Sequence, residues 1–204
     1  MRWTLIARKM NLFIAIIFAL AITGCSTSVT RMDAGEVKDL SGAWNDTDSQ
    51  QVSEEMIRDV LDRPWFGEFS RAQNRQPAVI VGEVVNLSHE HINVNTFVAD
   101  MERALINSGK VQFVASSTER REIREERKDQ DLHASEDTRK PMGQEKGADF
   151  MLKGTINTII DASGKTQLRF YQVDLTLISL ADNRKVWVGQ KKIKKLVERS
   201  NLRF

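Results

Sequence analysis

The sequence contains little of what catalytic and cofactor-binding sites are usually built from. Cysteine occurs once, at Cys25, so an intramolecular disulfide is excluded. Glycines such as Gly82 and Gly109 stand alone, and no glycine-rich loop that could hold a phosphate is present. No serine lies in the sequence context of a nucleophile elbow. These absences predict a protein that is not an enzyme and that carries no cofactor.

His89-Glu90-His91 is the one local cluster that could bind a metal ion. Residues two apart on a strand share a face, so the two imidazoles could reach one ion. No third ligand lies nearby, and His133 is far away in the sequence, which favours a surface loop instead. Acidic pairs such as Glu54-Glu55 are adjacent on a predicted helix and point apart, which is poor geometry for acid/base catalysis. We therefore expect no metal site and no catalytic residue.

Long hydrophobic runs are also scarce. The run Leu12–Ile22 is shorter than the roughly 20 residues that a membrane-spanning helix needs. It follows a basic start and leads into Ile22-Thr23-Gly24-Cys25, which is the layout of a secretory signal and resembles a bacterial lipobox. We predict that residues 1–24 are a lipoprotein signal peptide and that Cys25 is lipidated on its thiol and on its freed amine. The alternative interpretation is a transmembrane anchor with an incidental cysteine.

Removal of the signal peptide changes the charge balance. Three bases and no acid are lost, so the net charge goes from +2 to −1, which implies no nucleic-acid partner. Once Cys25 is acylated no free thiol remains for catalysis or for a zinc site. Ser26, rather than an aspartate, follows Cys25, and the resemblance to bacterial sorting signals implies the outer membrane. Lipid chains on Cys25 suffice for stable anchoring, with the domain facing the periplasm.

The mature chain divides into a tether and one domain. Residues 25–39 are small and polar and predict a lipidated N-terminus with a short flexible tether, whereas residues 40–204 are long enough for one globular domain with a core. The domain begins with a helical segment, residues 40–77. Asp48 or Ser49 is expected to cap a helix that Arg63-Pro64 ends, because proline cannot continue a helix.

Periodicity predicts a β-α-β unit in the centre of the chain. Residues 78–85 form a β-branched run that is apolar on both faces, as expected of a central strand. Asn95 is expected to cap a helix that buries Phe97 and Met101 and that stops at Gly109. A second strand is predicted over residues 110–115. A right-handed crossover then places both strands in one sheet.

Two polar helices and an antiparallel meander are expected to follow. Residues 119–131 carry mixed charge and hardly any apolar face, which favours a solvated helix over a partner-binding one. Residues 137–147 are interpreted as a second polar helix, although Pro141 lies inside it. Residues 150–160, 166–180 and 186–193 alternate between apolar and polar and predict three strands. The fold class is therefore α/β (α+β), with a single mixed sheet of about five strands flanked by helices.

Three tryptophans and a run of lysines each allow a functional as well as a structural interpretation. Trp44, Trp65 and Trp187 are expected to pack in the core or at its rim, and a role as binding hot spots is the alternative. The four lysines of Lys191-Lys192-Ile193-Lys194-Lys195 are expected to protect an edge strand from aggregation. Contact with anionic lipid or with a cell-wall polymer is the weaker interpretation.

Several segments resemble, in order, the penicillin-binding-protein activator LpoB family. They include Leu40–Asp48, Arg63-Pro64-Trp65, Val81–Asn86, Ala104–Val111, Gly147–Ile156, Phe170–Val173 and Lys185–Lys192. The resemblance spans about residues 40–195. It implies an α/β domain related to the amino-terminal domain of TolB, in an outer-membrane lipoprotein that binds a class A penicillin-binding protein and stimulates peptidoglycan synthesis. Only Cys25 can be carried over from the family as a site residue, and the residues that contact the partner stay unknown.

The chain departs from the family in the length of the tether between the lipid and the domain. The family's activators carry a long proline-rich tether, whereas here the predicted tether of about 14 residues spans at most roughly 50 Å. The alternative that this leaves open is a CsgG-like lipoprotein of an envelope or secretion assembly. CsgG itself has membrane-spanning strands, and this chain has no segment left over to form them.

Overall fold

The computed structural model of the protein describes residues 28–33 and 35–198. The chain divides after Glu36 into two units. In the first unit, the backbone N–H of Glu36 donates to the carbonyl oxygen of Asp33 over 3.1 Å and closes a turn. The second unit begins at Val37 and contains all the helices and strands described below. The predicted signal peptide and Cys25 lie outside the described residues. Among the residues that are described, no helix has both the length and the hydropathy needed to cross a bilayer.

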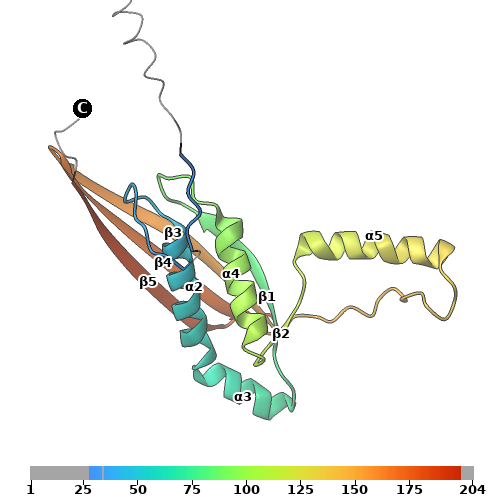
Figure 1. The fold of residues 1–204 in the computed structure, drawn as a ribbon. Helices are drawn as coiled ribbons and strands as arrows, with labels where there is room; N and C mark the ends of the chain where they lie inside the picture. Colours follow the sequence, from blue (N-terminus) through green and yellow to red (C-terminus); the bar gives the residue numbers. More distant parts are fainter. Residues whose placement is uncertain (1–27, 34, 199–204) are drawn as a thin grey trace, which may run out of the picture. The chain divides into compact units, whose positions relative to one another are not determined.

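One five-stranded sheet organises the second unit, and the predicted fold class is confirmed (Figure 1). The strands are β1 (Ala78–Asn86), β2 (Gln112–Phe113), β3 (Phe150–Ser163), β4 (Thr166–Ser179) and β5 (Lys185–Glu198), in the spatial order β2-β1-β3-β4-β5. Strand β1, which the sequence predicts to be central, is an interior strand and pairs in parallel with both β2 and β3. The pairs β3–β4 and β4–β5 are antiparallel and form the predicted meander. Only β2 is much shorter than its predicted span of residues 110–115.

Four helices occur in the described part of the chain: α2 (Asp46–Leu61), α3 (Pro64–Gln73), α4 (Val94–Asn107) and α5 (Ser117–His133). Two predicted caps are wrong. Asn45, and not Asp48 or Ser49, caps α2, because the Asn45 side chain accepts from the Asp48 N–H while the Asp48 carboxylate accepts from the Asn45 N–H. Asn93, two residues before the predicted cap Asn95, caps α4.

Two further sequence predictions need correction. The helical segment 40–77 contains two helices. Pro64 follows the end of α2 and also begins α3, because the N–H group that proline lacks would have no hydrogen-bond partner in the first turn of a helix. Residues 137–147 are not a helix and run back toward β3 as turns and irregular chain. Pro141 explains this difference, since it would break a helix near its middle.

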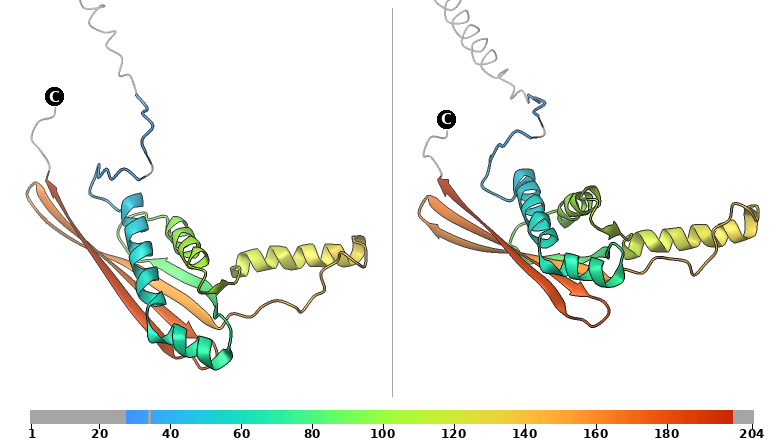
Figure 2. Two further views of the ribbon diagram at one scale, coloured as in Figure 1. Left: turned by 60° about the horizontal axis from the view of Figure 1, so that its bottom comes forward. Right: turned by 90° about the horizontal axis from the view of Figure 1, so that it is seen from below.

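The core lies between the sheet and the helices on one of its faces. Figures 1 and 2 show α2 and α4 on the same side of the sheet. The alternating apolar residues of β4 are buried there: Tyr171 and Leu175 are 0% exposed, Val173 is 1% and Leu177 is 2% exposed. Phe97 and Met101 of α4, also 0% exposed, meet them. A smaller cluster on the other face joins Ala78 and Ile80 of β1 to Val114.

Candidate functional site

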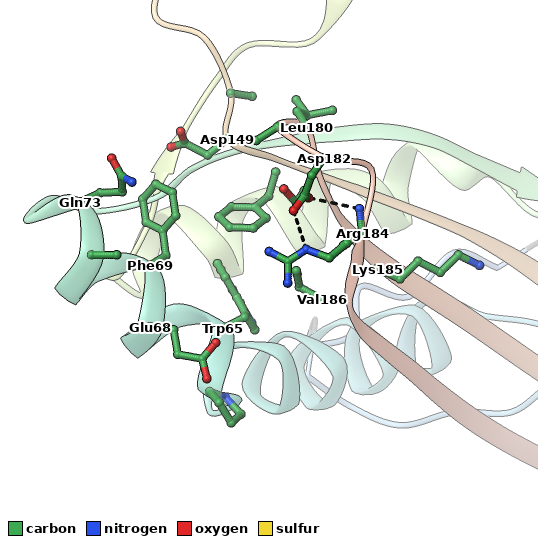
Figure 3. Close-up of a pocket in the computed structure, with 16 residues that line it drawn as sticks. Trp65, Glu68, Phe69, Gln73, Asp149, Leu180, Asp182, Arg184, Lys185 and Val186 are labelled. Atoms are coloured by element: carbon green, nitrogen blue, oxygen red, sulfur yellow. Dashed lines mark hydrogen bonds and ion pairs between the residues drawn. The ribbon is translucent and has the colours of Figure 1, made fainter.

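A hollow of about 870 Å³ lies between α3 and the turn that connects β4 to β5 (Figure 3). Its walls come from three places that are distant in the sequence: α3, the start of β3 and the β4–β5 turn. The side chains that line it include Trp65, Glu68, Phe69, Gln73, Asp149, Phe150, Leu180, Asp182, Arg184, Lys185 and Val186.

Three aromatic rings form the apolar part of this hollow. The ring of Phe150 lies 4.9 Å from that of Trp65 and 5.2 Å from that of Phe69, in both cases edge to face. The Trp65 indole is fixed because its Nε1–H donates to the carbonyl oxygen of Val60 over 2.6 Å. Trp65 and Phe150 are each 6% exposed, so their positions are set by the core. They provide a rigid apolar surface to whatever enters the hollow.

An ion pair closes one side of the hollow. The guanidinium of Arg75 donates to both carboxylate oxygens of Asp149 over 2.7 Å and stacks over the Phe69 ring at 5.0 Å. Asp149 also accepts from the backbone N–H of Ala78, at the start of β1. The bonds from Arg75 and then from Ala78 outweigh burial and hold the pKa of Asp149 below its usual range.

The β4–β5 turn forms the opposite side. Asp182 accepts from the Arg184 backbone N–H and from its guanidinium, and hydrogen bonds from Ser179 and Arg184 lower the pKa of Asp182 to about 2. Asn183 takes the left-handed conformation, with φ 61°, that the tight turn requires. Charged groups thus surround an aromatic floor. This arrangement suits the binding of an apolar side chain that belongs to a charged partner segment.

Glu90 of the His89-Glu90-His91 cluster makes several hydrogen bonds within the domain. The Glu90 carboxylate accepts from the backbone N–H of Trp44, from the Tyr171 hydroxyl and from the Arg169 guanidinium, over 2.8 to 3.1 Å. Burial and this hydrogen bond raise the pKa of Tyr171. Among the described residues, no three potential metal ligands come together. Glu90 instead joins the start of the domain to β4.

The lysines of β5 split between the two faces of the sheet. Lys191 contacts Glu55 of α2, and Lys195 donates to Asp39 over 2.8 Å and to Asp48 over 2.6 Å. Burial lowers the pKa of Lys195, but the bonds to Asp39 and Asp48 outweigh it, so the net shift is upward. Lys192 and Lys194 are exposed on the opposite face. Two of the four predicted edge charges are therefore structural.

The three tryptophans pack as predicted. Trp65 and Trp187 are each 6% exposed, and Trp44 packs edge to face on Tyr171 at 5.6 Å. Sequence reasoning missed Phe69 and the pair Arg75–Asp149 as parts of the hollow. The helix that carries Phe69 could have been found from Pro64, which favours the first helical position, but the ion pair links residues 74 positions apart and leaves no local signal.

Comparisons with known proteins place these features in a family. The family model described as peptidoglycan-synthase activator LpoB matches residues 48–193. Comparison with curated protein sequences gave no match. The chain is also similar to the solved C-terminal domain of LpoB from Escherichia coli, with 12% identity, a TM-score of 0.43, and coverage of 72% of this chain and 99% of that one. For the lipoprotein GNA1162 from Neisseria meningitidis, the identity is 15%, the TM-score 0.39, and the coverage 61% of this chain and 87% of that one.

The structural likenesses have TM-scores below 0.5 and carry no weight here, so the assignment depends on the family match. That match begins in α2 and ends in β5, and it includes α3, the hollow and Glu90. It spans more than half of the sequence. The chain therefore belongs to the peptidoglycan-synthase activator LpoB family.

Proposed function

We propose that this protein binds a class A penicillin-binding protein in the periplasm and stimulates its synthesis of peptidoglycan. The observation that carries the proposal is the family match over residues 48–193. Members of the family activate a synthase, and catalysis belongs to that partner. The hollow beside α3, with its aromatic floor and charged sides, supports a binding role for this domain.

The same proposal includes an outer-membrane anchor. Cys25 would carry the lipid after removal of residues 1–24, and the domain would face the periplasm. The lipobox Ile22–Cys25 and the chain's lack of any other cysteine support this.

Reconstitution with the synthase tests the function. The mature protein is added to the class A penicillin-binding protein of the same bacterium, and glycan polymerisation and peptide cross-linking are measured. We expect both rates to rise with the folded protein and not with the same protein after heat denaturation. Unchanged rates in the presence of a demonstrated complex would contradict an activator role.

Substitution of Cys25 tests the anchor. In cells fed a fatty-acid analogue, we expect the wild-type protein to be labelled and found in the outer membrane, and Cys25→Ala to be unlabelled. Because Cys25 is the chain's only cysteine, no second cysteine can be replaced as a control. The neighbouring substitution Ser26→Ala serves instead and should be labelled normally. Undiminished label in Cys25→Ala would disprove lipidation at this residue.

A further inference from the structure

Strand β5 forms a long free edge of the sheet. Its 14 residues, Lys185–Glu198, pair only with β4, and no other described strand or helix runs alongside its outer side (Figures 1 and 2). In an antiparallel ladder, alternate residues direct their N–H and C=O groups away from the partner strand. About half of the β5 backbone groups therefore face outward. The opposite edge strand, β2, has only two residues.

Free edges of this length are normally blocked, and β5 is protected by charge and by one register irregularity near its start, between the residues Lys185 and Trp187 that pair with β4. It contains no proline, and it carries five lysines and a single glutamate. Lys192 and Lys194 are exposed and make no ion pair with any residue that the structure describes, whereas Lys191 and Lys195 are held by acids of the same chain. Pairing of two β5 strands would bring these lysines together. The edge thus repels a second copy of itself and attracts an acidic strand.

Hollows lie beside most of this edge, along residues 185–190 and again along residues 194–198. The hollow with Trp65 and Phe69 lies beside Lys185 and Val186 at the start of β5. A second, of about 630 Å³, lies between α2 and residues 187–190. A third, of about 740 Å³, lies between residues 39–42 and residues 194–198. Side chains of a strand added to β5 would alternate between the two faces, and those on the helix side would have this space to enter.

We propose that an acidic, extended segment of the partner synthase adds to β5 as a sixth strand. This inference rests on the proposed function and specifies how the partner binds. Main-chain hydrogen bonds to the outward groups of β5 hold the segment. Its carboxylates face Lys192 and Lys194 on the helix-free side, and an apolar side chain near its Lys185 end enters the hollow formed with Trp65 and Phe69.

Amide hydrogen exchange of the complex tests the proposal. Exchange is followed at each β5 amide of the mature protein, alone and with the purified class A synthase. We expect the outward amides of residues 185–198 to exchange rapidly in the free protein and at least tenfold more slowly in the complex, because they gain hydrogen bonds. A complex that leaves these amides unchanged would overturn strand addition and leave the activator function standing. Failure of the synthase to bind would overturn both.

A charge substitution provides a matched comparison. We expect Lys192→Glu with Lys194→Glu to weaken synthase binding at least tenfold. The control Lys140→Glu with Lys153→Glu makes the same change of charge on exposed lysines outside β5 and should alter binding less than twofold. Melting temperatures within a few degrees of wild type exclude misfolding in both variants. Equal losses in the two variants would show a general charge effect and overturn the β5 assignment.

Discussion

Glu90 joins three parts of the domain that are far apart in the sequence. Its carboxylate accepts from Trp44, Arg169 and Tyr171, which lie 46, 79 and 81 positions away. The Glu90 and Arg169 side chains are each 17% exposed, and Tyr171 is 0% exposed. Removal of the carboxylate would leave the Arg169 guanidinium without its charged partner, and the Tyr171 hydroxyl with the more distant carbonyl oxygen of Gly42, 3.3 Å away, in a place that water reaches poorly. Glu90 is therefore a structural residue that ties the loop between β1 and α4 to the start of the domain and to β4.

We expect Glu90→Ala to lower the free energy of unfolding by roughly 2–3 kcal/mol. This is less than the 3–5 kcal/mol typical of breaking a fully buried pair, because the pair keeps some contact with water. Tyr171→Phe removes one hydrogen bond and should cost about 1 kcal/mol. His91→Ala, at the exposed neighbour, should change stability by less than about 0.5 kcal/mol. Urea unfolding measures all three, and an equal effect of Glu90→Ala and His91→Ala would refute the role of Glu90.

Asp149 makes stability depend on pH. Arg75 and the Ala78 N–H lower the pKa of its carboxyl, so the ionised form is favoured in the folded protein. The stability that follows is fully present above the ordinary pKa of 3.8 and is lost as pH falls through the lower value of the folded state.

We therefore expect Asp149→Asn to destabilise the protein by about 1–2 kcal/mol at pH 7 and by progressively less as pH falls below about 4. Thermal unfolding of both proteins across this range measures the difference. Asp161→Asn, at an exposed position near the end of β3, is the control and should show almost no effect at either pH. A difference that stays constant from pH 7 to the acid limit would argue against a role of the Asp149 charge.

At the scale of elements, α5 stands apart from the rest of the domain (Figures 1 and 2). None of its 17 residues is buried, which confirms the predicted solvated helix. It is held to the returning chain by the pairs of Arg124 and Arg127 with Glu145, at 2.8 and 3.2 Å. Exposed ion pairs of this kind contribute little to stability. We therefore expect that the fold does not require this helix.

Replacing residues 117–146 by an eight-residue Gly/Ser linker should leave the free energy of unfolding within about 1 kcal/mol of wild type, because no core contact is lost. Phe97→Ala in α4, by contrast, should cost roughly 3–5 kcal/mol, because this side chain is 0% exposed. Thermal or urea unfolding compares the two.

Since the proposed docking edge is β5, stimulation of the synthase should also survive the deletion. Its loss would restore the alternative that α5 is the partner-binding face.

At the scale of the whole molecule, the question is how far the domain can reach from its anchor. Leu61, Trp65, Val60 and Val52 of the first two helices are between 0% and 7% exposed. Burial of such side chains contributes roughly 1.5–3 kcal/mol each, so detaching α2 and α3 to lengthen the tether would cost too much. The proposed tether then sets the reach, at about 50 Å when fully extended.

A flexible 20-residue Gly/Ser linker inserted after Ser28 should add roughly 25 Å of root-mean-square reach. If distance limits activation, synthase stimulation in cells should be preserved or increased, while binding in solution stays unchanged. An insertion of the same 20 residues into the β3–β4 turn, beside Gly164, controls for the added chain without changing reach. Loss of stimulation only in the tether variant, with normal binding in solution, would count against a distance-limited activator.

The sequence by itself determined the periodic features of this protein. Strict alternation of Tyr171, Val173, Leu175 and Leu177 predicted a one-sided strand, and β-branched residues on both faces of 78–85 predicted the central one. The absence of convergent catalytic groups and the order of family-like segments led to the activator hypothesis. Such signals are visible because side-chain direction repeats every two residues in a strand and every 3.6 in a helix. Helix caps were less certain, because neighbouring Asn, Asp and Ser residues compete for the same role.

Only the tertiary structure decided which distant side chains meet. Arg75 reaches Asp149, and Lys195 reaches Asp48 across 147 positions, because strand order and helix placement bring them together. The same cause divides the four lysines of residues 191–195 into two that pair with acids and two that are exposed, although all four look alike in the sequence. Whether β5 has a free outer side is also a property of the sheet order. An edge exists only once each strand's neighbours are known, since the strand's own residues specify its faces but not its partners.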